Sequence, residues 1–124
     1  MRIFKTKALA RFTKSERIAD ASLADAIDRA ERGLVDADLG GGLIKQRVAR
    51  TGQGKSGGYR MVIGIMMQDR AVFLFGFAKN DLDNIGDKQL ATLQDTAAAW
   101  LAADDAKLKR AMAEGLLIEV RNGN

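Results

Sequence analysis

The spacing of hydrophobic residues in the first third of the chain predicts one strand and one helix. Residues 2–6 form a short run that is typical of a strand. Residues 13–32 repeat apolar side chains at steps of three and four, with acidic side chains between them, which is the pattern of an amphipathic helix. We expect this helix to begin at Thr13 or Ser15, whose side chains can cap it, and to end before Gly33.

The middle of the chain is predicted to form three strands. Residues 38–42 end in three glycines and are expected to be a flexible connection. Apolar runs follow at residues 43–50, 59–67 and 70–78, and a loop with four glycines at residues 51–58 separates the first two. Because loops this short join only antiparallel neighbours, the three runs should form an antiparallel meander.

Helical spacing returns in the last third of the chain, at residues 87–102 and 104–114, before a closing edge strand at residues 116–121. This order of elements predicts an α+β fold in which a small antiparallel sheet packs against N-terminal and C-terminal helices. A length of 124 residues fits one domain, so residues 1–124 are expected to fold as a single unit.

Side chains alternate in the two apolar runs at the centre of this sheet, and the alternation predicts which face the helices cover. The bulky set at odd positions is expected to pack against helix: Met61, Ile63, Ile65, Phe73, Phe75 and Phe77. The set at even positions includes Gly64 and Gly76 and has polar ends, so we expect it to line a shallow concave surface.

The composition excludes several kinds of chemistry. The chain has no cysteine and no histidine, so disulfides, thiolate metal sites, a cysteine nucleophile and the usual general base near neutral pH are all excluded. There is no apolar leader and no run of about 18 apolar residues, so we expect a cytoplasmic protein with no membrane contact.

Charge is distributed unevenly along the chain, although the total is only +4. Residues 1–18 carry a net charge of +5, residues 19–42 carry −4, residues 43–80 carry +6 and residues 81–124 carry −3. A basic centre between acidic segments indicates a local surface for an anion such as an RNA backbone, with a merely solvated surface as the alternative.

Lys45 and Arg47 are the first candidates for chemistry. They are two residues apart in a predicted strand, so they should project from one face about 7 Å apart. A neighbouring cation favours the neutral amine of a lysine, and a neutral amine can act as a base. Arg50 ends the same run, and Arg60 opens the next strand, where its charge must reach solvent, pair with an acid or meet a phosphate.

The loops and strand ends supply further candidates for RNA contact. Lys55 lies in the glycine-rich loop. Tyr59, the only tyrosine, is either a core ring with a satisfied hydroxyl or a platform on which a base stacks. Lys79 and Asn80 end the phenylalanine-rich strand, where exposed side chains on a rigid scaffold often carry function, although Asn80 could equally be a turn residue.

The run Gly52-Gln-Gly54-Lys-Ser-Gly57 has the spacing of a dinucleotide-binding motif and resembles the end of a phosphate-binding loop. Both motifs require a strand that leads into a helix, whereas here the flanking segments are both predicted strands. We therefore do not expect a nucleotide site.

Two motifs at a specific spacing resemble the RelE/HigB-like toxins of bacterial toxin–antitoxin systems. The run Lys55-Ser-Gly-Gly-Tyr-Arg60 is followed by Phe73-Leu-Phe-Gly-Phe-Ala-Lys-Asn-Asp81 and then by Asn84-Ile85. The resemblance extends from residue 1 to near residue 121. The family fold is a compact antiparallel sheet wrapped by N-terminal helices, which agrees with the elements predicted above.

The resemblance implies an endoribonuclease that cuts messenger RNA on the ribosome and is silenced by a cognate antitoxin encoded beside it. Such enzymes activate a ribose 2′-hydroxyl against the adjacent phosphate with basic side chains, so the resemblance implies no metal or other cofactor. By position, Lys45 is the candidate base, because arginine stays protonated. Arg47 belongs to the same basic strand, and Arg60 and Lys79 are candidates for stabilising charge in the transition state.

Two positions depart from the family pattern. Asn80 and Gly86 stand where family members carry an arginine and a tyrosine, so the acid that protonates the leaving group is open between Tyr59 and Lys55. Two other functions also remain open: a ParE-like toxin that inhibits DNA gyrase by binding, and a degenerate member that acts only as a protein-binding or regulatory module. A homodimer or a toxin–antitoxin hetero-oligomer is the expected assembly.

Overall fold

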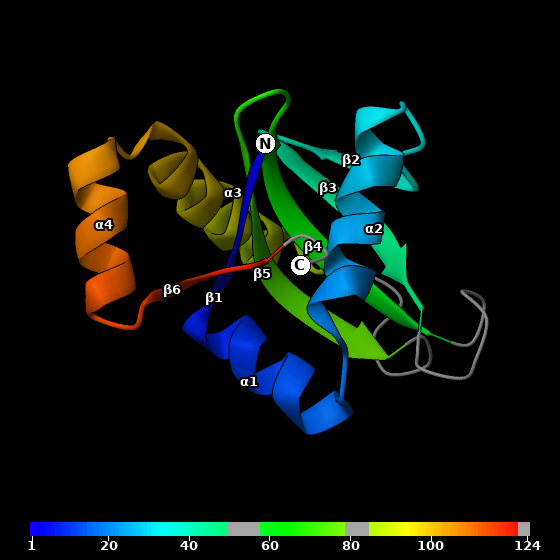
Figure 1. The fold of residues 1–124 in the computed structure, drawn as a ribbon. Helices are drawn as coiled ribbons and strands as arrows, with labels where there is room; N and C mark the ends of the chain where they lie inside the picture. The colour runs from blue at the N-terminus through cyan, green and yellow to red at the C-terminus, as the bar shows by residue number, and fades with distance from the viewer. Residues whose placement is uncertain (50–57, 79–84, 122–124) are drawn as a thin grey trace.

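The structure is a computed structural model that describes residues 1–49, 58–78 and 85–121 (Figure 1). Its elements follow in the order β1 (Arg2–Thr6), α1 (Lys7–Glu16), α2 (Asp20–Glu31), β2 (Ala37–Gly40), β3 (Leu43–Val48), β4 (Tyr59–Met66), β5 (Arg70–Ala78), α3 (Asp87–Ala102), α4 (Asp105–Ala113) and β6 (Leu117–Glu119). Within these ranges, no helix is both long enough and apolar enough to cross a membrane.

The strands form one sheet in the order β2-β3-β4-β5-β1-β6. Neighbouring strands are antiparallel except for β1 and β5, which are parallel. Two helices and three strands separate β1 from β5 in the sequence, so no short loop requires these two neighbours to be antiparallel. The predicted α+β fold is confirmed, and the sheet is mainly rather than wholly antiparallel.

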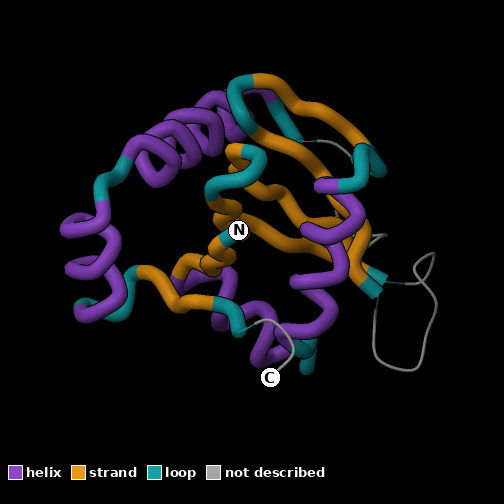
Figure 2. Tube along the Cα trace, turned by 45° about the horizontal axis from the view of Figure 1, so that its top comes forward, coloured by secondary structure: helices purple, strands orange, loops and turns teal. Residues whose placement is uncertain are grey.

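Helices cover both faces of the sheet (Figures 1 and 2). In Figure 1, α2 lies in front of the strands, α1 lies below them and α3 lies behind them, and Figure 2 shows helices on both sides of the strands. One apolar core lies under α1 and α2, and a second lies under α3 and α4. The expected concave surface is therefore wrong where α3 crosses it: a Cβ built on Gly64 would lie 2.9 Å from the Cβ of Ala97.

The single helix expected over residues 13–32 is two helices. Thr6 accepts a hydrogen bond from the backbone N–H of Leu9 and so begins α1 well before the expected start. Arg17 ends α1 in the left-handed conformation, with φ of 57°, and the N–H of Ile18 donates to the carbonyl of Thr13. Thr13 lies inside α1 and is buried, so it does not cap a helix.

The glycine-rich connection expected at residues 38–42 belongs in part to an edge strand. β2 pairs with β3, and Gly40, Gly41 and Gly42 turn the chain between them with positive φ angles of 80°, 62° and 83°. Residues with side chains rarely adopt these angles, which explains the three glycines.

β5 contains a bulge that changes which face its phenylalanines occupy. Val62 pairs with Phe75 and Ile63 pairs with Phe73, so Leu74 is an extra residue in the ladder. Phe73 packs under α1 and α2, whereas Phe77 packs in the core under α3. The expectation that Phe73, Phe75 and Phe77 share a face is therefore wrong, because an extra residue reverses the alternation beyond it.

Candidate functional site

Three cations from two strands gather on the face of the sheet that carries α3. Arg47 in β3 lies directly opposite Arg60 in β4, and Lys45 lies opposite Val62. Directly opposite residues have Cβ atoms about 4.5–5.5 Å apart. Gln46, between Lys45 and Arg47, points to the opposite face and is fully buried there. The predicted shared face for Lys45 and Arg47 is confirmed, and Arg60 joins them.

Arg60 carries a buried polar atom without a partner in the described part of the chain. Its guanidinium Nη1 is buried and makes no hydrogen bond with residues 1–49, 58–78 or 85–121. Its neighbour in the adjacent strand β5 is Phe77, and the centroid of the Phe77 ring lies 5.8 Å from that of the Phe75 ring. Arg60 thus lies between Arg47 and an apolar wall. Leaving a buried polar group unpaired costs about 1–3 kcal/mol, and more for a charged group, so an anion bound here would supply what the fold does not.

Arg47 is held in place by Asp36. The backbone N–H of Arg47 donates to Oδ2 of Asp36 over 2.6 Å, and Nη2 of the same arginine lies 3.5 Å from Oδ1. The side chain of Arg47 is still 44% exposed, so its charge remains accessible. Lys45 is partly exposed and makes no ion pair or side-chain hydrogen bond with the part of the chain that the structure describes.

Buried polar side chains fix β3 from the opposite face. The guanidinium of Arg29 donates to the carbonyl of Arg47. Nε2 of Gln46 donates to the carbonyls of Ala26 and Leu34 over 2.9 and 3.1 Å. These contacts support the backbone beneath the cations. These contacts were not predicted from the sequence, because a lone glutamine and an arginine within a helix carry no signal for such a role.

Tyr59 lies on the opposite face from Arg60, in the core under α1. It is 1% exposed, and its ring meets that of Phe12 edge-on with centroids 5.5 Å apart. Its hydroxyl donates to Oε1 of Glu16 over 2.8 Å. Of the two roles left open for Tyr59, the structure supports the core ring. A role in stacking on RNA or protonating a leaving group is not supported, because neighbouring residues of a strand point to opposite faces.

Four further candidates lie outside the described residues: Arg50, Lys55, Lys79 and Asn80. Among the residues that the structure does describe, no group of three or more acidic side chains is arranged to hold a metal ion.

The arrangement of these cations opposes stability and favours anion binding. Like charges directly opposite each other in a sheet are destabilising by roughly 0.2–1 kcal/mol. Arg47 and Arg60 are such a pair, and the buried Nη1 of Arg60 adds a further cost. Local features that work against folding often mark a functional site. A phosphate group is the natural ligand, because it offers several acceptor oxygens to two planar guanidinium groups.

One comparison with known proteins gives a match over nearly the whole chain. The sequence model of a family described as "RelE toxin of RelE / RelB toxin-antitoxin system" matches residues 1–120. These residues include every helix and strand of the fold. No curated protein matches the chain.

Proposed function

The chain belongs to the RelE family of toxins from toxin–antitoxin systems, and we propose that it is a ribosome-associated endoribonuclease that cuts messenger RNA. Its activity is held in check by an antitoxin partner. The observation that carries the proposal is the group of three cations on one side of the sheet, where a buried nitrogen of Arg60 has no partner among the described residues.

Cleavage would proceed through the 2′-hydroxyl of the ribose. The amine of Lys45 takes the proton from this hydroxyl, and the 2′-oxygen attacks the adjacent phosphorus. The bond from phosphorus to the 5′-oxygen of the next nucleotide then breaks, which leaves a 2′,3′-cyclic phosphate. Lys45 is the candidate for the base, because an arginine guanidinium stays protonated in proteins.

Arg47 and Arg60 would stabilise the negative charge that develops on the phosphate oxygens. Both are already ordered on a rigid sheet, so little reorganisation is needed when the charge appears. Phe77 lies directly opposite Arg60 in β5, and its ring packs beside that of Phe75. Apolar neighbours lower the local dielectric, which strengthens the interaction of a cation with an anion. Lys79 would add positive charge, and Arg50, Lys55 and Asn80 are the further candidates for RNA contact.

Lys55 is the remaining candidate for the acid that protonates the leaving group. The other candidate, Tyr59, lies in the core, where its hydroxyl donates a hydrogen bond to Glu16. The ammonium group of a lysine can give a proton to the departing 5′-oxygen, so the proposed reaction uses side chains alone and requires no cofactor.

The test is expression of the toxin with alanine at single positions, followed by primer extension on an abundant message. We expect discrete cuts from the native chain and a rate lower by about 10²–10³-fold for Arg47→Ala or Arg60→Ala. Lys45→Ala should lose about 10²–10⁴-fold. Lys45→Arg is the sharper variant, because it keeps the charge but removes the base.

Lys109→Ala is the matched control, since Lys109 is an exposed cation on α4. It should cut at the native rate. Retained cutting and growth arrest in all three alanine variants would rule out this site. Growth arrest with DNA damage and no cuts in RNA would instead identify a gyrase inhibitor.

A further inference from the structure

Asp36 lies at the edge of the sheet, where it contacts both the backbone and the side chain of Arg47. It directly precedes the edge strand β2, which pairs with β3. Its Oδ2 accepts the backbone N–H of Arg47 over 2.6 Å, and its Oδ1 lies 3.5 Å from Nη2 of the same arginine. Among the described residues, Asp36 is the only acid that forms an ion pair with any of the three cations.

Polar contacts from the other side of β3 fix this carboxylate. The backbone N–H of Asp36 donates to Oε1 of Gln46 over 2.7 Å. Oδ2 of Asp36 lies 4.0 Å from Nη1 of Arg29, whose side chain is buried. Arg29 is held in turn by Asp25, with Nε donating to Oδ2 over 3.1 Å. The carboxylate is therefore held in one position beside Arg47 before any ligand binds.

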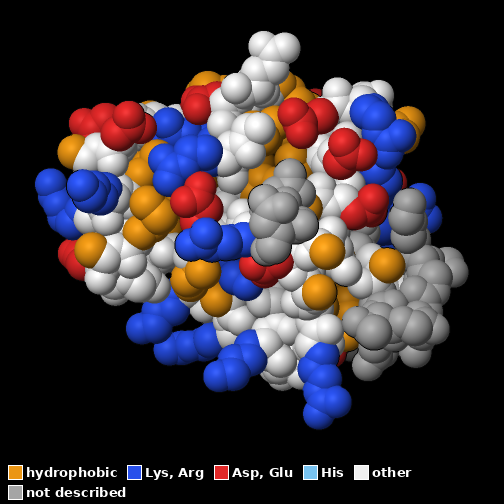
Figure 3. All heavy atoms as spheres, viewed as in Figure 1, with side chains coloured by type: hydrophobic (Ala, Val, Ile, Leu, Met, Phe, Trp, Pro, Cys, Tyr) orange, Lys and Arg blue, Asp and Glu red, His pale blue; other side chains and the backbone are white. Residues whose placement is uncertain are grey.

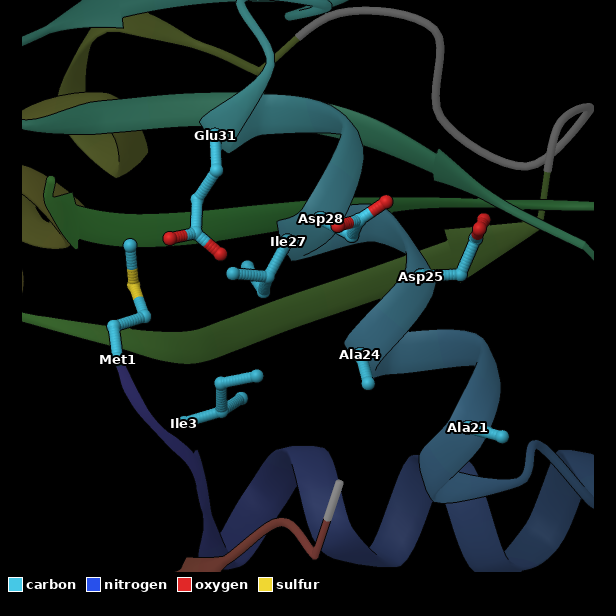
Figure 4. Close-up of a pocket in the computed structure, with 8 residues that line it drawn as sticks. All are labelled: Met1, Ile3, Ala21, Ala24, Asp25, Ile27, Asp28 and Glu31. Atoms are coloured by element: carbon cyan, nitrogen blue, oxygen red, sulfur yellow. The ribbon is translucent and has the colours of Figure 1, made fainter. Parts of the chain in front are cut away.

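Other acids on this side of the molecule have partners within α2. Figure 3 shows acidic and basic side chains interspersed over α2. Asp25 pairs with Arg29 and Asp28 pairs with Arg32, each over 3.1 Å. Figure 4 shows the side chains of Asp25 and Asp28 directed away from Met1. Asp28 is thus an acid with an arginine partner outside the candidate site, which makes it a suitable control for Asp36.

The ion pair between Asp36 and Arg47 holds the guanidinium without using up its donors. Its 3.5 Å separation is longer than the roughly 2.7–2.9 Å of a full charge-assisted hydrogen bond. Arg47 also lies directly opposite Arg60, and the two like charges repel each other. The carboxylate offsets this repulsion, so the guanidinium of Arg47 stays beside that of Arg60 and can still donate to a phosphate.

The same carboxylate sets the total charge of the site. When Lys45 is neutral, as a base must be, Arg47, Arg60 and Asp36 together carry one positive charge, which equals the single negative charge of a phosphodiester. Transfer of the 2′-hydroxyl proton to the Lys45 amine adds one positive charge to the site. Attack of the 2′-oxygen on phosphorus adds one negative charge to the phosphate at the same time. The charges of site and substrate therefore rise together.

We propose that Asp36 is a positioning residue of the cleavage site, which orients Arg47 and weakens the binding of uncleaved RNA relative to the transition state. This inference rests on the proposed nuclease function. A negative charge beside the phosphate opposes ground-state binding, whereas an oriented guanidinium favours the charge that develops during attack. Only interactions that are stronger in the transition state than in the ground state raise kcat.

The test is Asp36→Asn, in which the side-chain oxygen can still accept the backbone N–H of Arg47. Cleavage of a defined message on ribosomes by the purified protein gives kcat and KM. We expect KM to fall by about threefold, because a negative charge is removed. We expect kcat to fall by about 10–100-fold, because Arg47 is no longer held in position. Structural damage would instead lower kcat and raise KM.

Three further measurements separate the charge of Asp36 from its position. Asp28→Asn should leave kcat and KM within about twofold of the native values. Asp36→Glu keeps the charge but moves the carboxylate, so it should lower kcat with KM nearly unchanged. When Arg47 is already replaced by alanine, Asp36→Asn should no longer lower kcat, because Asp36 acts through Arg47.

The outcomes for this inference and for the nuclease function are distinct. A native kcat or a raised KM for Asp36→Asn would overturn the inference and leave the nuclease function intact. Loss of cooperative melting in this variant would identify Asp36 as a structural residue and would also overturn it. If the native protein cuts no message, the nuclease function is wrong and the inference fails with it.

Discussion

Replacing Arg60 by methionine should make the protein more stable and less able to bind phosphate. Methionine removes the charge that faces Arg47. It also removes the buried Nη1, which has no hydrogen-bond partner in the part of the chain that the structure describes. The flanking Phe77 offers the new side chain an apolar neighbour.

The expected gain follows from the two costs that the substitution removes. Relief of like-charge repulsion across the strands contributes about 0.2–1 kcal/mol. Removal of an unsatisfied buried polar group contributes about 1–3 kcal/mol. We therefore expect the free energy of unfolding to rise by about 1–4 kcal/mol. For a domain of this size, each kcal/mol raises Tm by roughly 3–5 °C.

Arg70→Met is the matched control, because Arg70 is also an arginine of the central sheet but has partners. Its Nη1 donates to the carbonyls of Trp100 and Ala103 over 3.0 and 2.7 Å, at the end of α3, and its side chain is 12% exposed. Losing these bonds should lower the free energy of unfolding by about 2–4 kcal/mol. The same chemical change should thus have opposite effects at the two positions.

Thermal unfolding followed by circular dichroism measures both variants. Millimolar inorganic phosphate gives a second readout, because a ligand that binds only the folded state raises its Tm. Phosphate should raise Tm for the native chain and for Arg70→Met, and much less for Arg60→Met. If Arg60→Met unfolds at a lower temperature than the native chain, Arg60 is a structural residue and the reasoning from its buried nitrogen is refuted.

Three further substitutions test the fold. Tyr59→Phe should lower stability by about 1 kcal/mol in urea unfolding and leave RNA cleavage unchanged, because the hydroxyl serves the core. Gly64→Val should lower the urea midpoint by an amount equivalent to about 1–3 kcal/mol, because the new side chain would meet Ala97. The hydrogen bond from Arg2 lowers the pKa of Glu119. The stabilisation from this ion pair is therefore fully present above the ordinary pKa of a glutamate carboxyl. It is lost as the pH falls through the lowered pKa of Glu119. Since both side chains are exposed, Glu119→Gln should cost less than about 1 kcal/mol at neutral pH and nothing in acid, as urea unfolding at both pH values can show.

The helix boundaries illustrate what the pattern of the sequence could and could not predict. Periodicity located α3, which spans the expected residues 87–102, because its apolar stripe is continuous. The break between α1 and α2 was missed, since apolar spacing continues across it. The turn depends on Arg17 adopting the left-handed conformation, which arginine adopts rarely and which no residue type there indicates.

The candidate site was predictable to the extent that it depends on strand alternation. Side chains of a strand alternate between the two faces of the sheet, and this alternation placed Lys45 and Arg47 on one face. It also implied that the adjacent residues Tyr59 and Arg60 face opposite ways. The sequence did not predict that Arg47 lies directly opposite Arg60, because the register of two strands depends on the path of the loop between them. The contact with Asp36 joins segments that the pattern treats separately.

The bulge in β5 connects the fold to the proposed chemistry. Without the extra residue at Leu74, regular alternation would keep Phe75 and Phe77 on the face of Phe73, under α1 and α2. The bulge turns both rings to the face of Arg60, where they form an apolar wall in the strand next to that of the arginine. An arginine beside such a wall binds an anion more strongly than one surrounded by water, because the local dielectric is lower.

The same bulge places Gly76 on the opposite face, where only a residue without a side chain fits: a Cβ there would lie 2.8 Å from both the Met61 sulfur and the Phe12 ring. One inserted residue therefore accounts both for the glycine in the phenylalanine-rich strand and for the environment of the cation on which the proposed cleavage depends.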